Sequence, residues 1–259
     1  MRQSCVIALL CCSICCYAAP EGISIPTIEG IKHSIVPIVC GYLDVHEKFQ
    51  IAFVAGTGFF IDTDGRFITD AHVVDKDKWD ARIKETHACI PAIYIPNNGW
   101  GKFQYDIAFQ YYWFPNCDRD ATVDLAVCKP IENPFASTRI PKGTIRAVSF
   151  DADEYPDGTP IAFTGFPLEI KSPITSIGFK AGTLGVTYDT THFGFVIDKA
   201  VWPGASGSPV YLESGKVIGI IYAAGTGLGA GMGFSKSAAI INDFLSKHSP
   251  PQQQSEQKK

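Results

Sequence analysis

The sequence predicts an all-β fold built from two packed antiparallel barrels. Apolar residues make up 46% of the 259 residues and charged residues only 19%, and the chain contains 24 glycines and 17 prolines. This composition suits strands and tight turns better than helices. In the second half of the chain, short apolar runs recur about every ten residues with glycine, aspartate or proline between them, a spacing typical of antiparallel barrels.

Residues 1–19 have the pattern of a secretory signal. Arg2 supplies the positive end, residues 6–14 form an apolar stretch, and residues 17–19 provide the cleavage site. The stretch is too short to span a bilayer. It holds five of the nine cysteines, so lipidation is an alternative, although the residues before these cysteines do not resemble a lipoprotein cleavage site. We therefore expect an exported protein: periplasmic, at the cell surface or secreted.

The net charge of the chain is −4. Proteins that bind nucleic acids or anionic membranes carry a basic footprint, so we expect neither as a partner of the mature chain. No metal-ligand spacing is present, and we expect no metal and no cofactor.

Four cysteines remain after removal of the signal: Cys40, Cys89, Cys117 and Cys128. In an exported chain they allow two disulfides with three connectivities. We favour Cys89 with Cys117, across a hairpin. The alternative is that each is a free, buried, small apolar residue.

The first half of the mature chain is predicted to begin with a loop at residues 20–26 and to continue with strands. Asp64-Gly65 separates two apolar runs, which is a strong hairpin signal. This hairpin ends just before His72. The predicted strands are 34–43, 53–62, 66–69 and, further along, 123–127, which carries Asp124.

Residues 75–120 are rich in aromatic side chains and are predicted to form a long hairpin with its turn at residues 96–99. Aromatic residues are ordinary strand content, so we expect them to pack against a barrel face. A platform that stacks carbohydrate or nucleobases is the alternative. Residues 118–120 are predicted as a solvated, charged loop.

A proline-rich linker at residues 130–141 divides the chain. We therefore expect an N-terminal barrel at 20–135, a C-terminal barrel with a helix at 136–248, and a disordered polar tail at 249–259. The helix is predicted at 235–247 from its apolar spacing. The predicted strands of this half are 145–150, 160–165, 172–184, 194–198, 209–213, 217–222 and 231–234.

Ser206 lies in a tight turn between Gly204 and Gly207. Glycines on both sides allow the N–H groups of Gly204 and Ser206 to point into one small pocket, as an oxyanion hole requires. The same residues would also suit an ordinary β-turn. A serine nucleophile needs a base within reach and an acid that orients this base.

His72 and Asp124 are the candidates for these two roles. Together with Ser206 they follow the chain order His, Asp, Ser, which is one of three common orders for such a triad. Asp70 competes for the acid role but lies too near His72 in sequence to reach its ring easily, and Asp120 lies in the predicted solvated loop. The histidines without a comparable setting are His33, His46, His87, His192 and His248.

The chain resembles the chymotrypsin-like serine peptidases, and within them the bacterial trypsin-like and Deg/HtrA-type peptidase domains. The resemblance covers about residues 34–247. It implies two six-stranded barrels in the chymotrypsin-like arrangement and an endopeptidase that cleaves polypeptides through an acyl-enzyme. The segments that carry it are 56–59, 69–74, 124–127, 204–209, 217–220 and 233–235.

The resemblance also implies a specificity pocket with Ala200 at its base and Ala224 and Gly233 in its walls. With no acidic residue there, we expect cleavage after small to medium apolar side chains. The substrate would pair as a strand with Tyr222, Ala223 and Ala224.

The chain departs from the family in two respects. Ala205 stands where peptidases activated by N-terminal cleavage carry an aspartate, so we do not expect that activation. Too few residues follow the predicted helix for a PDZ module. Two alternative functions remain: a non-catalytic binding protein of the same fold, and an acyl esterase that uses the same triad.

Overall fold

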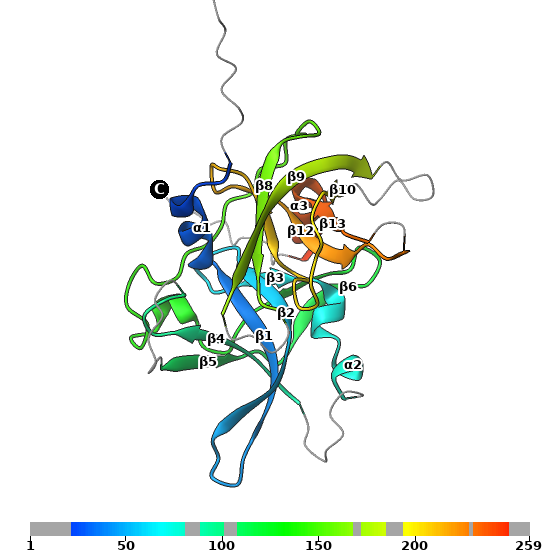
Figure 1. The fold of residues 1–259 in the computed structure, drawn as a ribbon. Helices are drawn as coiled ribbons and strands as arrows, with labels where there is room; N and C mark the ends of the chain where they lie inside the picture. Colours follow the sequence, from blue (N-terminus) through cyan, green and yellow to red (C-terminus); the bar gives the residue numbers. More distant parts are fainter. Residues whose placement is uncertain are drawn as a thin grey trace, which may run out of the picture.

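The computed structural model describes residues 22–80, 89–100, 108–167, 172–184, 194–227 and 230–248. The predicted signal at 1–19 and the predicted tail at 249–259 lie outside these ranges. Figure 1 shows the strands of the first half and those of the second half as two packed groups, with the β1–β2 hairpin extending away from the second group.

The first half contributes a seven-stranded antiparallel sheet in the order β5-β4-β1-β2-β3-β7-β6. Its elements are α1 (Ile25–Lys32), β1 (Ile35–Leu43), β2 (Phe49–Phe60), β3 (Phe67–Thr69), the 3-10 helix η1 (Ala71–Val74), α2 (Lys76–Asp80), β4 (Ile90–Pro96), β5 (Phe109–Trp113), β6 (Cys117–Asp120) and β7 (Leu125–Cys128).

The first half differs from the predicted six-stranded barrel in its number of strands and in its closure. Within the described ranges no pairing joins the outer strands β5 and β6, so the sheet remains a half-barrel. The additional strand is β6, which pairs residue by residue with β7 where the sequence predicted a charged loop at 118–120. An edge strand tolerates charged side chains because one of its sides faces solvent.

The second half forms a closed six-stranded barrel in the order β10-β13-β12-β11-β8-β9, as predicted. Its core contains Phe163, Phe195, Val210 and Ile221. The elements of this half are the 3-10 helix η2 (Pro134–Ala136), β8 (Pro160–Gly165), β9 (Ile174–Leu184), β10 (Gly194–Ile197), β11 (Pro209–Tyr211), β12 (Val217–Ala224), β13 (Gly233–Ser237) and α3 (Ala238–His248).

Residues 145–150 do not form the predicted strand. Their backbone crosses between the halves and divides its hydrogen bonds: Val148 N–H donates to Phe60 O at 2.9 Å, and Val217 N–H donates to Ser149 O at 2.9 Å. Phe150 makes a single parallel bridge with Val217. Because no partner runs alongside for more than one residue, no ladder forms.

Of the helices at the two ends of the described chain, α3 was predicted and α1 was not. The predicted helix near the C-terminal end is present as α3, on whose inner side Ile241 and Phe244 are buried. The loop predicted at 20–26 is instead cut short by α1, which begins after Ser24. Pro26 does not prevent this helix, because proline is tolerated in a first turn. In the described part of the chain, no helix is both long and apolar enough to cross a membrane.

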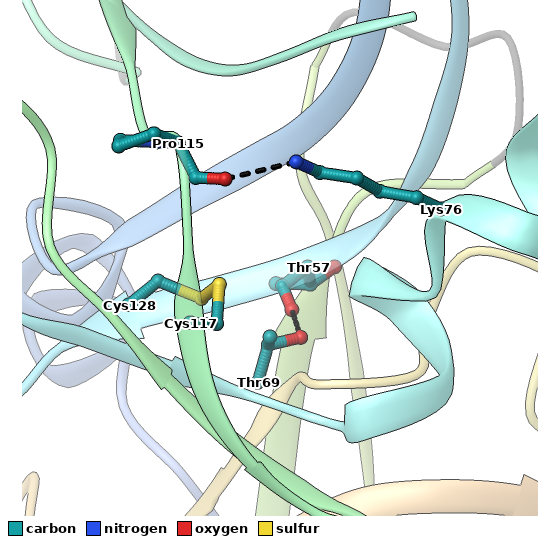
Figure 2. The surroundings of a disulfide bond; sticks show 6 residues. All are labelled: Thr57, Thr69, Lys76, Pro115, Cys117 and Cys128. Carbon is teal, nitrogen blue, oxygen red and sulfur yellow. Dashed lines mark hydrogen bonds between the residues drawn. A yellow bond between two sulfur atoms is a disulfide. The ribbon is translucent and has the colours of Figure 1, made fainter.

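Two disulfides join neighbouring strands of the first half. Cys40 in β1 is bonded to Cys89, directly before β4, and Cys117 is bonded to Cys128 across the β6–β7 pair (Figure 2). The predicted pairing of Cys89 with Cys117 was wrong. Cys117 lies directly opposite Cys128 in an edge hairpin. Because the sequence analysis predicted a loop at 118–120, it did not indicate this pairing.

The aromatic side chains of the first half pack against one another, as expected for a barrel face. Tyr94 is buried, and its ring centroid lies 5.1 Å from that of Phe109 and 5.7 Å from that of Trp100. Trp100 also contacts Phe166 of the second half, with ring centroids 4.7 Å apart. These rings therefore form part of the packing between the halves.

Candidate active site

His72 lies on η1, immediately after β3. Its Nδ1 atom is 2.9 Å from Asp124 Oδ2 and 3.2 Å from Oδ1, and its backbone N–H donates to Asp124 Oδ1 at 2.9 Å. A carboxylate can only accept hydrogen bonds, so the ring proton belongs on Nδ1, and Nε2 keeps its lone pair. This is the tautomer that a general base needs.

Asp124 precedes β7 and adopts a left-handed backbone conformation with φ 51°. Such a conformation is uncommon for a residue other than glycine. Its carbonyl oxygen accepts from Ala71 N–H at 3.1 Å, while its carboxylate contacts His72. The main chain and the side chain of Asp124 therefore both hold η1 in place.

The pKa values of this pair move apart. Burial favours neutral Asp124, but its hydrogen bond with His72 and the charge of Lys236 outweigh burial and lower the pKa of the carboxyl below its ordinary value. Burial also opposes ionisation of the His72 ring, yet the hydrogen bond with Asp124 and the charges of Asp70 and Asp124 raise its pKa. The site thus stabilises an imidazolium next to a carboxylate.

Asp70 does not bond to the His72 ring. Its side chain is fully buried, and its Oδ1 lies 3.4 Å from Lys236 Nζ, which comes from β13. The same ammonium lies 3.6 Å from Asp124 Oδ2. Sequence reasoning missed Lys236, because nothing near it in the chain marks it as part of this site.

Carboxylate and ring atoms of Asp70, His72 and Asp124 all lie within 4.8 Å of one another. Such spacing could hold a metal ion. Lys236 already brings a positive charge to both carboxylates, so the group does not require a metal ion for charge balance.

The Ser206 loop is shaped by glycines with positive φ, 94° at Gly204 and 84° at Gly207. A Cβ on Gly207 would lie 1.9 Å from Thr57 O, so only glycine fits this close approach. Gly207 N–H donates to Ile221 O at 2.8 Å. Among the described residues, the N–H groups of Gly204 and Ser206 donate to no partner, so both remain available to an oxyanion.

Thr57 of β2 holds this loop against the first half. Its N–H donates to Ser206 O at 2.9 Å, and its hydroxyl donates to Gly204 O at 3.0 Å. Its own carbonyl accepts from the hydroxyl of Thr69, three residues before His72, at 2.7 Å (Figure 2). One buried residue therefore connects the Ser206 loop with the strand that leads to His72.

The segment that carries His72 and the Ser206 loop meet at Gly56. A Cβ at Gly56 would lie 2.7 Å from Val73 Cγ1 and 3.0 Å from Ser206 O, so the neighbour of His72 and the backbone of Ser206 flank the same residue. No hydrogen bond joins Ser206 Oγ to another residue in the described ranges. Contacts of this kind often tighten only when substrate binds.

The residues predicted to line the specificity pocket are unequally exposed. Ala200 and Ala224 are exposed and Gly233 is buried. A Cβ on Gly233 would lie 2.4 Å from Val201 Cγ2, so Val201, which the sequence reasoning did not select, packs on this glycine. Its position next to Ala200 is the only signal that could have indicated it.

Tyr222, Ala223 and Ala224 form the end of β12. The strand pairs with β11 only through Val217, Gly219 and Ile220. Beyond these residues β13 is the partner strand in the described part of the chain. The other edge of this strand end therefore has main-chain groups available for a further strand.

Comparisons with known proteins agree with this arrangement. A family model described as the trypsin-like peptidase domain matches residues 56–220. The active form of the Rv3671c protease from M. tuberculosis is 20% identical to this chain, with a TM-score of 0.59 and 90% of both chains covered. The HtrA-type protease AlgW, solved with a decapeptide, is 15% identical, with a TM-score of 0.62 and with 85% of this chain and 66% of that chain covered.

No curated protein sequence matches the chain. At these identities the solved structures show the fold, whereas the family model covers more than half of the sequence, including the segments with His72, Asp124 and Ser206. The chain therefore belongs to the trypsin-like peptidase family and is a serine endopeptidase.

Proposed function

We propose that the protein is an exported serine endopeptidase with Ser206 as nucleophile, His72 as general base and Asp124 as the acid that orients it. The observation that carries this proposal is the His72–Asp124 contact, which leaves Nε2 free to accept a proton. Thr57 ties the Ser206 loop to the same region.

In this mechanism His72 Nε2 takes the Ser206 proton as Oγ attacks the peptide carbonyl carbon. Asp124 stabilises the resulting imidazolium, and the N–H groups of Gly204 and Ser206 stabilise the oxyanion. The imidazolium then gives its proton to the leaving amine. Water, deprotonated by His72, hydrolyses the acyl-enzyme and regenerates the serine.

The loop conformation does not depend on a charge next to the nucleophile. Ala205 is fully buried and offers no carboxylate to a new N-terminal amine. Thr57 and Ile221 hold the loop through neutral hydrogen bonds instead. We therefore propose that activity does not require cleavage of the N-terminus beyond removal of the signal.

For specificity, we propose cleavage after small to medium apolar residues, with the substrate strand on the free edge of Tyr222–Ala224. The packing of Val201 on Gly233 supports a narrow pocket. A peptide-library cleavage profile tests this proposal, and equal or better cleavage after arginine would contradict it.

Export agrees with the two disulfides, because such bonds persist in oxidising compartments. Fractionation of the producing cell, together with mass spectrometry of the mature N-terminus, tests this part. A cytosolic protein that retains residues 1–19 would refute it.

Fluorophosphonate labelling of the mature protein tests the nucleophile. Ser206→Ala should abolish labelling and lower kcat for casein by about 10³-fold or more. Ser208→Ala is the matched control, because Ser208 lies two residues away, is fully buried, and its hydroxyl has no partner among the described residues; labelling should persist. An unlabelled wild-type protein would favour a non-catalytic binding function, and turnover of esters but not amides would favour an esterase.

A further inference from the structure

Lys236 is a buried cation that the triad mechanism does not use. Its side chain is 6% exposed, and an ammonium group at such a site carries a large desolvation cost unless charges of opposite sign surround it. Asp70 at 3.4 Å and Asp124 at 3.6 Å supply two such charges. The ring of Tyr222, 3.9 Å from Nζ, supplies a cation–π contact.

We propose that Lys236 and Asp70 are positioning residues that act as one buried ion pair on the Asp124–His72 couple. Lys236 contacts Asp124 Oδ2, the same oxygen that accepts the hydrogen bond from His72 Nδ1. The ammonium and the imidazole ring therefore contact the same carboxylate oxygen of Asp124. This inference rests on the proposed catalytic roles of His72 and Asp124.

Charge balance explains why both members of the pair are needed. With neutral His72, the two aspartates and Lys236 together carry one negative charge, and the cluster becomes neutral when His72 takes a proton. Lys236 without Asp70 would leave the resting cluster neutral, so the imidazolium would add an uncompensated buried charge. Asp70 thus cancels the repulsion between Lys236 and the imidazolium.

The charged and titratable groups of this cluster come from both halves of the molecule. Asp70 precedes η1, Asp124 precedes β7, Lys236 comes from β13 and Tyr222 from β12. Burial raises the pKa of Tyr222, so the phenol stays neutral at ordinary pH. Burial raises the pKa of Asp70 to about 6, despite the opposing charges of Lys236 and His72, so Asp70 carries its charge at neutral pH and loses it in mild acid.

NMR titration of the His72 ring tests the inference, with the resonance assigned by its loss in His72→Asn. Asp70→Asn should lower the His72 pKa by about one unit, because the variant loses an anion within 4.8 Å. Lys236→Met should raise the His72 pKa by less, since Asp70 then takes up a proton more readily. The double variant should restore the wild-type pKa to within about 0.3 unit.

The rate of fluorophosphonate labelling should follow the same pattern. At neutral pH we expect about a tenfold loss for Asp70→Asn, as one pKa unit corresponds to a factor of ten, and partial recovery in the double variant. Should a single variant fail to fold, the double variant, neutral and similar in shape at both sites, still reports whether the charges act as a pair.

Lys180→Met is the matched control. Lys180 is also buried, and it pairs with Asp157 at 2.7 Å in the second half. This variant should lose stability without changing the His72 pKa. If Asp70→Asn and Lys236→Met likewise lower only the unfolding temperature, the inference is overturned. If the wild-type protein is unlabelled but its His72 pKa shifts as expected, the proposed nucleophile fails and the electrostatic inference stands.

Discussion

The two halves of the molecule manage their strand edges in different ways. The six strands of the second half close into a barrel, so each strand has a neighbour on both sides. The seven strands of the first half leave β5 and β6 at the edges, and its two disulfides attach β6 to β7 and the start of β4 to β1. Hydrogen-bonded closure stabilises one half, and covalent links stabilise the other.

The candidate site is divided along the same boundary. His72, Asp124 and Asp70 come from the disulfide-linked half, whereas Ser206 and Lys236 come from the closed barrel. Thr57 joins the halves by bonding to the Ser206 loop. Variants at the contact between the halves, and in the disulfide-linked half, test whether this difference between the halves affects stability and activity.

The largest loss of stability is expected from Gly207→Ala, which disrupts the contact between the Ser206 loop and Thr57 of the first half. Its Cβ would lie 1.9 Å from Thr57 O, on a residue with φ 84°. The free energy of unfolding should fall by about 4 kcal/mol or more, measured by denaturant titration. Gly215→Ala is the control, because Gly215 also has positive φ (76°) but no atom within 4 Å; it should cost only about 1 kcal/mol. Equal costs would show that the close approach to Thr57 does not matter.

Removal of the disulfides tests how much these covalent links stabilise the first half. Replacing Cys40 and Cys89 by alanine should cost about 4 kcal/mol, and replacing Cys117 and Cys128 about 3 kcal/mol, from loops of 49 and 11 residues. Hydrogen exchange should rise in the first half, while β8 to β13 keep their protection. Equal loss of protection in both halves would contradict the comparison.

Thr57→Val should have the smallest of the three effects on stability. It removes the hydroxyl that donates to Gly204 O at 3.0 Å and accepts from Phe166 N–H at 2.9 Å, at a cost of about 2 kcal/mol. Because the Gly204 carbonyl then loses its anchor, we expect kcat to fall more than KM rises. Thr57→Ser keeps the hydroxyl and should retain near wild-type kcat; a matching loss in both variants would exclude the hydroxyl as the cause.

The all-β fold class and most strands of the second half could be predicted from the sequence alone. Apolar runs separated by turn residues predicted β8, β11 and β12, because short apolar runs and turn chemistry are local properties of the sequence. The selection of His72, Asp124 and Ser206 also came from local context and chain order. In the structure His72 contacts Asp124, and the Val73 side chain and the Ser206 carbonyl oxygen both lie close to Gly56.

Features that depend on partners far away in the chain could not be predicted from the sequence. Cys117 faces Cys128 because the register of the β6–β7 pair places them opposite each other. Residues 145–150 form no strand because their hydrogen bonds go to both halves. Lys236 joins Asp70 across 166 residues of chain. A buried charge is recognisable only when the groups that neutralise it are known, and the chain order does not show them.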